Sequence, residues 1–229
     1  MITASDILYE DNHLIAVNKP SGMLTQKDTT GDICLLDEVK LFLKTKYNKP
    51  GEAFIGCIHR LDRPVSGVIL LAKTSKALER MNIQFREKQT RKKYYAIVKN
   101  QPPKQEDTLV HFLLKSSTKN ISKAHLKEIP YSKRAELDYK VIAKSDQFYL
   151  LEIELKTGRH HQIRVQLAAI GCPIRGDLKY GFPRSNDDGN ISLHSFNLIF
   201  NHPVKGDLIN IISLPHGKDA LWDYFLTQI

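Results

Sequence analysis

The segment CIHRLDRPVSGVILLAKT, residues 57–74, places one acid, Asp62, between Arg60 and Arg63 in a break between two apolar runs. The runs IGCI and VILLA are apolar and β-branched and predict strands, whereas RLDRPVSG, with its proline and glycine, predicts a connecting loop. We therefore expect Asp62 on a short loop that is fixed at both ends, which is a frequent location for chemistry. A surface ion pair with a neighbouring arginine is the alternative.

A second candidate constellation is the segment TGRHHQIR, residues 157–164. Arg164 follows His160 and His161 by about one turn of the helix expected there, so the three side chains should lie near one another. The start of a helix carries partial positive charge and N–H groups, and arginines such as Arg159 add to its attraction for anions. A phosphate site, an ion pair with a distant acid and simply solvated arginines are the interpretations that the segment leaves open.

The same residues argue against other kinds of site. Zinc needs ligands at i and i+4 of a helix, or a Cys/His set with short spacings, and the sequence has neither pattern. It also contains no P-loop, no dinucleotide-binding glycine pattern and no nucleophile elbow. We therefore expect no metal site.

The composition suits a polyanionic partner. The chain has 34 Lys and Arg against 25 Asp and Glu, a formal net charge of +9, which favours RNA or DNA although many basic proteins bind neither. Its three cysteines, Cys34, Cys57 and Cys172, are widely separated in apolar sequence, which indicates reduced, buried thiols rather than a disulfide framework. The N-terminus lacks the pattern of a signal peptide, and no apolar stretch approaches transmembrane length. We expect a cytoplasmic protein with no membrane association.

These candidate residues must be positioned by a fold that mixes strands and helices without regular βαβ alternation. Two strands are expected on either side of the turn at 11–12, helices in LLDEVKLFLKTKY and SKALERMNIQFREK, and a strand in KYYAIVK. Ser75 is the expected N-cap of the second helix and Thr157 that of the helix in HQIRVQLAAI, which Gly171 should end. The basic middle of the chain, residues 101–144, predicts hairpins and loops that lean out from the core, and forms either a phosphate-contacting surface or solvated loops.

Two closing strands, in ISLHSFNLIFNHP and DLINIISLP, and a short helix that contains Trp222 complete the expected elements. No shift in composition marks a linker. We therefore expect residues 1–229 to form a single α+β domain.

Several ordered segments, spread over nearly the whole chain, resemble the RluA family of RNA pseudouridine synthases: YEDNHLIAVNKPSGM, HRLDRPVSG, KKYYAIV, TGRHHQIRVQLAAIGCPIRGDLKYG and ISLHSFNLIFNHP. The resemblance implies an α+β fold with a mixed, largely antiparallel central sheet flanked by helices and loops, and an RNA-binding cleft. It also implies one catalytic domain over residues 1–229 and no metal, nucleotide or organic cofactor. Many members carry a small additional RNA-binding domain at the N-terminus, and we expect that domain to be missing here.

The resemblance assigns three catalytic residues. Asp62 falls on the catalytic aspartate of the family, Tyr94 in KKYYA on its active-site tyrosine, and Arg164 in HQIR on the arginine that pairs with the aspartate. Tyr95 should point to the opposite face of the strand and serve packing. Three positions depart from the family pattern and bear on substrate detail rather than on activity: Val65, Gln166 and Cys172.

The implied reaction needs only one carboxylate. The C1′–N1 bond of uridine breaks, the uracil turns within the pocket and C5 bonds to C1′, so no water is activated, in contrast to glycoside hydrolysis with two carboxylates. Asp62 must be ionised, whether it attacks a carbon or removes a ribose proton, and Arg164 beside it would favour that form and orient it. Tyr94 can stack on the flipped base and help to remove the C5 proton.

Four further residues are candidates for substrate binding. Because the target uridine must leave its stack, Arg60 and Arg63 are candidates to hold neighbouring phosphates or to fill the gap, with a purely structural pair as the alternative. Arg159 and His161 are the candidates in the second constellation. His59 is expected to be a structural histidine rather than an acid or base.

The expected partner is a structured tRNA or ribosomal RNA stem-loop, bound by a monomer with an affinity that falls steeply with salt. The rival function is a non-catalytic RNA-binding or ribosome-assembly factor on the same scaffold, and a base-excising glycosylase would instead release free uracil. The presence of Asp62, Tyr94 and Arg164 together counts against the rival, because binding alone has no use for an ionised acid facing RNA phosphates.

Overall fold

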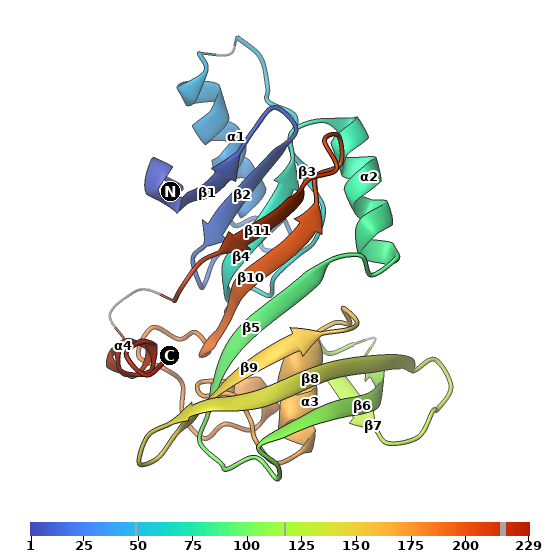
Figure 1. Cartoon of the computed structure of the whole chain (residues 1–229), viewed down its shortest axis with the longest axis vertical. Coiled ribbons are helices and arrows are strands. Elements are labelled where there is room, and N and C mark those ends of the chain that lie inside the picture. The colour runs from blue at the N-terminus through green and yellow to red at the C-terminus, as the bar shows by residue number, and fades with distance from the viewer. Residues whose placement is uncertain (49, 117, 216–218) are drawn as a thin grey trace. The chain divides into compact units, whose positions relative to one another are not determined.

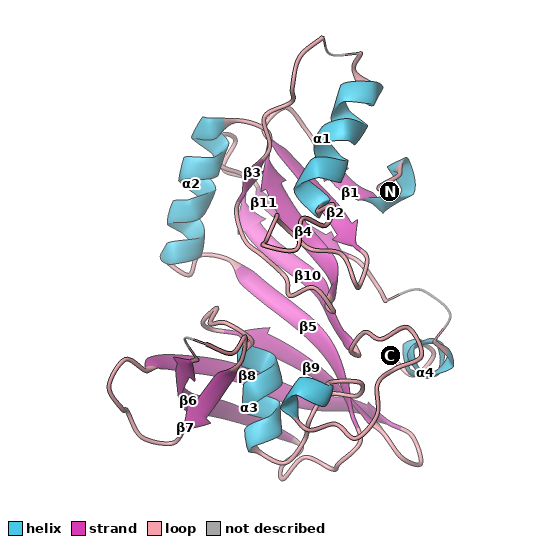
Figure 2. Ribbon diagram, turned by 180° about the vertical axis from the view of Figure 1, so that it is seen from behind, coloured by secondary structure: helices cyan, strands magenta, loops and turns pink. Residues whose placement is uncertain are grey.

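The computed structural model describes residues 1–48, 50–116, 118–215 and 219–229. Strands that pair largely antiparallel, with helices beside them, confirm the predicted α+β class (Figures 1 and 2). The elements in chain order are η1 (Ala4–Asp6), β1 (Ile7–Glu10), β2 (Leu14–Lys19), α1 (Leu35–Lys46), β3 (Gly56–Cys57), β4 (Ser66–Ala72), α2 (Ser75–Arg86), β5 (Arg91–Val98), β6 (Glu106–Lys115), β7 (Ser122–His125), β8 (Lys133–Lys144), β9 (Tyr149–Leu155), α3 (Gln162–Ala169), η2 (Leu178–Tyr180), β10 (Leu193–Asn201), β11 (Leu208–Ile212) and α4 (Ala220–Leu226).

The chain forms two compact units. Unit 1 comprises Met1–Arg91 and Ser195–Leu214, and unit 2 comprises Lys92–His194 and Pro215–Ile229. Asp62 belongs to unit 1, whereas Tyr94 and Arg164 belong to unit 2. The expectation of one catalytic domain over residues 1–229 stays a prediction, as does the RNA-binding cleft.

Unit 1 is built on the strand order β1-β2-β4-β10, with β3 beside β4 and β11 beside β10. The pairs β1–β2, β2–β4, β3–β4 and β10–β11 are antiparallel. Helix α2 packs on β3 and β4, and apolar side chains from both layers form one core cluster that includes Leu14, Val68, Leu70, Met81 and Phe200. Because β2 is buried along its whole length and β4 from Gly67 onward, the loop that joins β3 to β4 has a rigid support.

Unit 2 has the strand order β5-β9-β8-β6-β7, and every neighbouring pair in it is antiparallel. Helix α3 covers one face of these strands, as Figure 2 shows, and packs against β6 and β7. The helix has buried residues on all sides, from Gln162 to Leu167. Its polar side chains must therefore find partners inside the protein.

Three local expectations need correction. The N-cap of α2 is Thr74, whose side chain accepts from the Ala77 N–H, and not Ser75, which is the first helical residue. The N-cap of α3 is His161, in the left-handed conformation, and not Thr157. The hairpins expected in the middle of the chain are present, since β6 pairs antiparallel with β7 and with β8, but β6 and β8 are long regular strands rather than parts of loops.

No helix within the described residues is long and apolar enough to cross a membrane. Within the same residue ranges, no group of three His, Cys, Asp or Glu side chains is arranged to hold a metal ion.

Candidate active site

Asp62 lies on a tight turn in unit 1. The Val65 N–H donates to the Asp62 carbonyl at 3.0 Å, which closes the turn Asp62–Val65 just before β4. Leu61, on the other side of Asp62, is fixed by Thr25, whose hydroxyl donates to the Leu61 carbonyl at 2.9 Å and accepts from the Leu61 N–H at 3.2 Å. The predicted loop, held at both ends, is therefore present.

A buried lysine joins this turn to the turn that follows β2. Lys19 is fully buried, and its Nζ donates to the carbonyls of Pro20, Met23 and Arg63 at 3.0, 2.8 and 3.2 Å. Three acceptors match the three N–H groups of an ammonium. Burial lowers the pKa of Lys19 to about 7, whereas the nearby charge of Asp62 raises it. Lys19 therefore holds the backbone next to Asp62 and places positive charge near its carboxylate.

The arginines on either side of Asp62 differ in their surroundings. Arg63 donates from Nε to the Gly22 carbonyl at 3.0 Å and pairs through Nη1 with Asp32 at 2.8 Å. Arg60 is exposed and has no hydrogen bond or ion pair with any described residue. The backbone contact of Arg63 favours the structural role for this residue, and the geometry leaves Arg60 accessible to a ligand.

His59 has a structural environment. Its Nε2 accepts from the Leu70 N–H at 3.0 Å, and its ring stacks on Phe85 with 4.9 Å between centroids. These contacts support the interpretation of His59 as a structural histidine.

Tyr94 and Tyr95 lie on neighbouring positions of β5 in unit 2. Their strand partners on β9 are Ile153 and Glu152. Both rings are buried, with 6% and 8% of the residue exposed. Because successive strand residues point to opposite faces, the side chains of Tyr94 and Tyr95 lie on opposite faces of β5.

Arg164 projects from α3 into a buried ion pair. Its Nε and Nη2 donate to Asp177 Oδ2 and Oδ1 at 2.7 and 2.9 Å, and the two side chains are 5% and 1% exposed. The guanidinium also lies over the Tyr180 ring, with 5.1 Å from Cζ to the ring centroid. Two points of attachment and a stacked face fix the orientation of Arg164.

Asp177 was missed as a site residue, although the sequence contains a signal. A buried arginine in an apolar helix, such as Arg164, needs an acid as a counter-charge. Asp177, in the segment GCPIRGD that follows the helix, is an acid close enough in sequence to supply it. Gly176 has φ of +85°, and a Cβ there would lie 2.5 Å from the Asn190 carbonyl oxygen. The residue before the acid must therefore be a glycine, because the chain passes too close for a side chain.

The loop that precedes α3 is fixed by hydrogen bonds to the Gln162 side chain, whereas the N-cap residue His161 forms no side-chain capping hydrogen bond. Gln162 Oε1 accepts from Thr157 Oγ1 at 2.8 Å and from the Arg159 N–H at 2.9 Å. Arg159 is exposed and donates from Nε to the Arg134 carbonyl at 3.1 Å. Thr157, expected to cap the helix, instead ties the loop to Gln162 and to β8.

His161 and its neighbours surround the Arg164 pair. His161 Nδ1 hydrogen-bonds with the Tyr180 hydroxyl at 2.9 Å, and the Ser122 N–H donates to the same hydroxyl at 2.8 Å. The rings of His160 and His161 stack at 3.8 Å. Burial, followed by the charge of Arg164, lowers the pKa of His161 to about 2. His161 is therefore neutral near pH 7 and brings no positive charge to a phosphate; its contact with substrate stays a prediction.

The departures from the family pattern have structural explanations. Gln166 is fully buried, and its Nε2 donates to the Leu109 carbonyl at 3.1 Å and contacts His111 Nδ1 at 3.1 Å, which joins α3 to β6. Cys172 is buried as a free thiol, and burial raises its pKa to about 11. Val65, the last residue of the turn Asp62–Val65, is buried.

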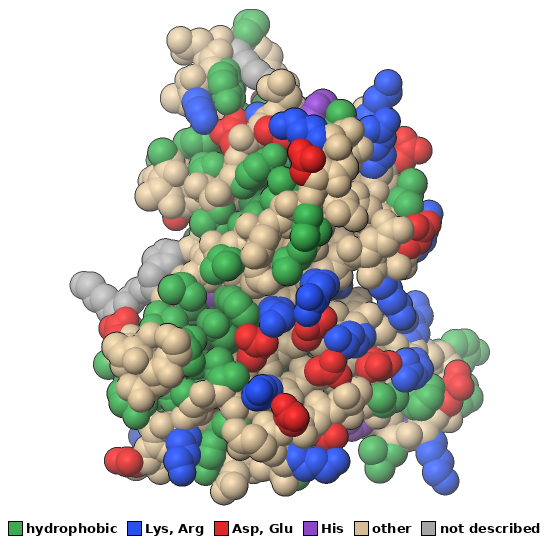
Figure 3. Space-filling model, in the orientation of Figure 1, with side chains coloured by type: hydrophobic (Ala, Val, Ile, Leu, Met, Phe, Trp, Pro, Cys, Tyr) green, Lys and Arg blue, Asp and Glu red, His purple; other side chains and the backbone are tan. Residues whose placement is uncertain are grey.

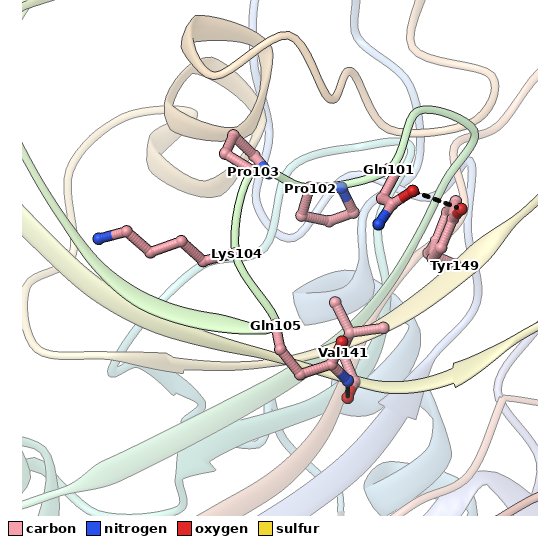
Figure 4. A pocket seen from close by; sticks show the side chains of 7 residues that line it. All are labelled: Gln101, Pro102, Pro103, Lys104, Gln105, Val141 and Tyr149. Carbon is pink, nitrogen blue, oxygen red and sulfur yellow. Dashed lines mark hydrogen bonds between the residues drawn. The ribbon is translucent and has the colours of Figure 1, made fainter.

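A cavity of about 230 Å³ in unit 2 contains none of the predicted site residues (Figure 4). Gln105 Nε2 donates to the Val141 carbonyl at 2.8 Å, and the Tyr149 hydroxyl donates to Gln101 Oε1 at 3.4 Å. Figure 4 shows the Lys104 side chain pointing away from the other lining residues. The cavity therefore offers few polar groups that the protein does not already use. Its lining residues are Gln101, Pro102, Pro103, Lys104, Gln105, Val141 and Tyr149.

The sequence profile described as "RNA pseudouridylate synthase" matches residues 13–169. A tRNA pseudouridine synthase C of Pectobacterium carotovorum subsp. carotovorum is 31% identical over 99% of this chain and 62% of its own length. A ribosomal large subunit pseudouridine synthase C of Vibrio vulnificus is 32% identical over 93% of this chain and 66% of its length, and a tRNA pseudouridine synthase C of Salmonella typhimurium is 32% identical over 97% and 89%.

The chain thus spans just under two thirds of the length of two of these relatives and most of the third. Among solved structures, human RNA Pseudouridylate Synthase Domain Containing 4 aligns with a TM-score of 0.81 at 22% identity, over 98% of this chain and 92% of that one. Human RNA Pseudouridylate Synthase Domain Containing 1 aligns with a TM-score of 0.71 at 22% identity, over 96% and 86%. These structures share the fold described above.

Proposed function

Because the chain belongs to the RNA pseudouridylate synthase family, we propose that it isomerises specific uridines of structured RNA to pseudouridine, with Asp62 as the catalytic carboxylate. The observation that carries the proposal is the family match over residues 13–169, since that range contains Asp62, Tyr94 and Arg164. The relatives are named for tRNA or for the ribosomal large subunit. The proposed substrate is therefore a tRNA or a ribosomal RNA stem-loop.

In the proposed reaction, Asp62 acts as an ionised carboxylate on the flipped uridine. The C1′–N1 bond breaks, the uracil rotates, C5 bonds to C1′, and the proton on C5 leaves last. Asp62 acts either on C1′ or on a ribose proton, and the rigid turn that holds its backbone supports both roles. Flipping costs a few kcal/mol of stacking, which contacts to the surrounding RNA must offset.

Arg164 is proposed to orient Asp62 and the substrate rather than to act as a lone positive charge. The bidentate contact with Asp177 already balances the charge of the guanidinium. What Arg164 then contributes is a set of N–H donors in a fixed plane, because Asp177 engages one edge of the guanidinium and Tyr180 lies against its face. Asp177 is, on this proposal, a positioning residue for Arg164.

Tyr94 is proposed to stack on the uracil and to assist removal of the C5 proton. Arg60 is proposed to hold a phosphate next to the flipped nucleotide, in agreement with its exposure. Arg63, Arg159 and His161 remain candidates for substrate contact. A tRNA or ribosomal RNA substrate would place the reaction in the cytoplasm, and the three free cysteines agree with a reducing compartment.

The test is release of tritium from RNA labelled at uridine C5. Wild type and Asp62→Asn are incubated with unmodified tRNA and ribosomal RNA, and Glu52→Gln, an exposed acid outside the turn, serves as the matched control. Release by wild type and Glu52→Gln but not by Asp62→Asn is the expected result. Binding of RNA without release from any of these substrates would point to the non-catalytic factor, and free uracil as product would point to a glycosylase.

A further inference from the structure

The connection between β7 and β8 carries a tyrosine in a backbone conformation that this residue rarely adopts. Tyr131 has φ of +66° and is 93% exposed. Few residues other than glycine have positive φ, and among those Asn and Asp are the most frequent. Since almost none of the ring is buried, packing within the chain does not offset the strain.

The turn around Tyr131 is rigid. The Ser132 N–H donates to the Ile129 carbonyl at 3.0 Å, and Pro130 occupies the second position, so a positive φ at the third position makes this a type II turn. The Ser132 hydroxyl donates to the Ile129 carbonyl at 2.6 Å and accepts from the Ile129 N–H at 3.0 Å. Glycine or asparagine would suit the position better, so the tyrosine stands here against the local backbone preference.

The surroundings of the turn are basic. Between residues 122 and 134 there are four Lys or Arg side chains against one acid, Glu128. Lys123, Lys127 and Lys133 are exposed and form no ion pair with any described residue. Positive charge on an exposed surface attracts phosphates, and the projecting loop is visible at the edge of the molecule in Figure 1.

Another surface of unit 2 offers a contrast. Lys93, Lys140 and Lys156 on or beside β5, β8 and β9 are each paired with an acid, as in the 2.7 Å contact between Lys93 and Glu152. Figure 3 shows lysine, arginine and acidic side chains interleaved over these strands. Lys123, Lys127 and Lys133 therefore differ from the lysines of this surface in having no acidic partner among the described residues.

We propose that Tyr131 stacks on an unpaired base of the RNA substrate, with Lys127 and Lys133 at the adjoining phosphates. This inference rests on the proposed function in taking RNA as the partner. A ring on a rigid turn loses little conformational freedom on binding. Base–aromatic stacking tolerates any base, and unpaired bases are the part of a structured RNA that a protein can reach. Tyr131 would thus bind RNA outside the reacting nucleotide.

The test compares affinities for in vitro transcripts of tRNA and of large-subunit ribosomal RNA domains. Tyr131→Ala should weaken binding by about 5- to 150-fold, the range of one lost base stack. Tyr131→Phe keeps the ring and should bind within about twofold of wild type. Tyr131→Asn relieves the backbone strain, so it should unfold at a higher urea concentration than wild type and yet bind as weakly as Tyr131→Ala.

The salt dependence separates stacking from charge. Tyr131→Ala should leave the slope of log affinity against log salt unchanged, whereas Lys127→Ala and Lys133→Ala should each make it shallower by about 0.7 to 0.9. Equal RNA affinity of wild type and Tyr131→Ala would overturn the inference. Tritium release by wild type is scored separately. A loss of affinity in Tyr131→Ala supports the stacking role even if wild type releases no tritium.

Discussion

Arg164 and Asp177 meet through two parallel hydrogen bonds, at 2.7 and 2.9 Å, inside unit 2. The pair lies between α3 and the segment that leads into η2, so it joins two parts of the chain that are separated by a loop. Replacing Asp177 by Asn should lower the free energy of unfolding by about 3 kcal/mol, because the buried guanidinium of Arg164 loses the negative charge of this pair.

The double variant Arg164→Met/Asp177→Leu tests the coupling. It removes both charges of the pair together, so its loss of stability should be clearly smaller than the sum for Arg164→Met and Asp177→Leu. Urea unfolding of wild type, the two single variants and the double variant gives the coupling energy between the two side chains. Strictly additive losses would show that the two side chains do not depend on one another.

His161 should make the protein sensitive to acid. Its pKa is about 2 in the folded protein and about 6.5 in the unfolded chain, so only the unfolded chain takes up this proton between those values. The contribution of neutral His161 to the free energy of unfolding should therefore be complete above about pH 6.5. Below that pH the free energy of unfolding should fall by about 1.4 kcal/mol per pH unit. His161→Asn, which tolerates the left-handed backbone, should have a flatter profile in urea unfolding between pH 7.5 and 5. An unchanged profile would assign the acid response to other groups.

Gly67, directly after Ser66 at the start of β4, cannot carry a side chain. Its φ is +113°, and a Cβ would lie 2.2 Å from the Ser195 carbonyl oxygen. Gly67→Ala should cost more than about 3 kcal/mol, since both backbones would have to move. Gly31→Ala is the matched control, because Gly31 also has positive φ, +76°, but no atom within 4 Å of the added carbon. Thermal unfolding that ranks the two variants equally would contradict the steric explanation.

Lys19→Met should loosen the turn that carries Asp62. The substitution leaves three carbonyls without their donor, and each buried unsatisfied group costs about 1–3 kcal/mol. Trypsin cleavage after Arg60 measures the local effect and should become faster in the variant. Lys46→Met, at a lysine whose side chain is 45% exposed, is the control and should leave cleavage unchanged. Faster cleavage in both variants would indicate general destabilisation instead.

Arg60 should contribute one phosphate contact. Arg60→Ala is expected to make the slope of log affinity against log salt shallower by about 0.7 to 0.9. Lys140→Ala, at an exposed lysine near Glu106, should not change the slope. Filter binding between about 50 and 200 mM salt covers the useful range. If both slopes equal that of wild type, Arg60 makes no phosphate contact.

The sequence predicted the elements with strong periodicity. The strands around Asp62 and the helix that buries Val39 and Leu43 follow from apolar spacing, although the structure buries Leu35 rather than Leu36 in the first turn of that helix. Hairpins are predicted for the middle of the chain, but the length and regularity of β6 and β8 are not, because charged residues on these strands, such as Glu106 and Lys140, pair across the sheet. A local pattern cannot reveal such cross-strand pairs.

The site was predicted less completely. Asp62, Tyr94 and Arg164 were assigned through the family resemblance, and their common role stays a prediction. Asp177 and Lys19 were not recognised as supports, because their function depends on burial and on contacts with residues distant in sequence, such as Arg63. The cap of α3 was placed wrongly at Thr157, since a histidine with left-handed backbone is not a usual cap.

The absence of a side chain at Gly176 has a consequence for genetics. Because Gly176 has no Cβ, the Asn186 side chain and the Asn190 carbonyl can pack directly against its backbone, next to Asp177. Loss-of-function variants at Asn186 should therefore cluster with those at Arg164, although Asn186 carries no chemistry. A mutational survey that scores positions by their distance from the reacting base would misclassify this segment as tolerant surface.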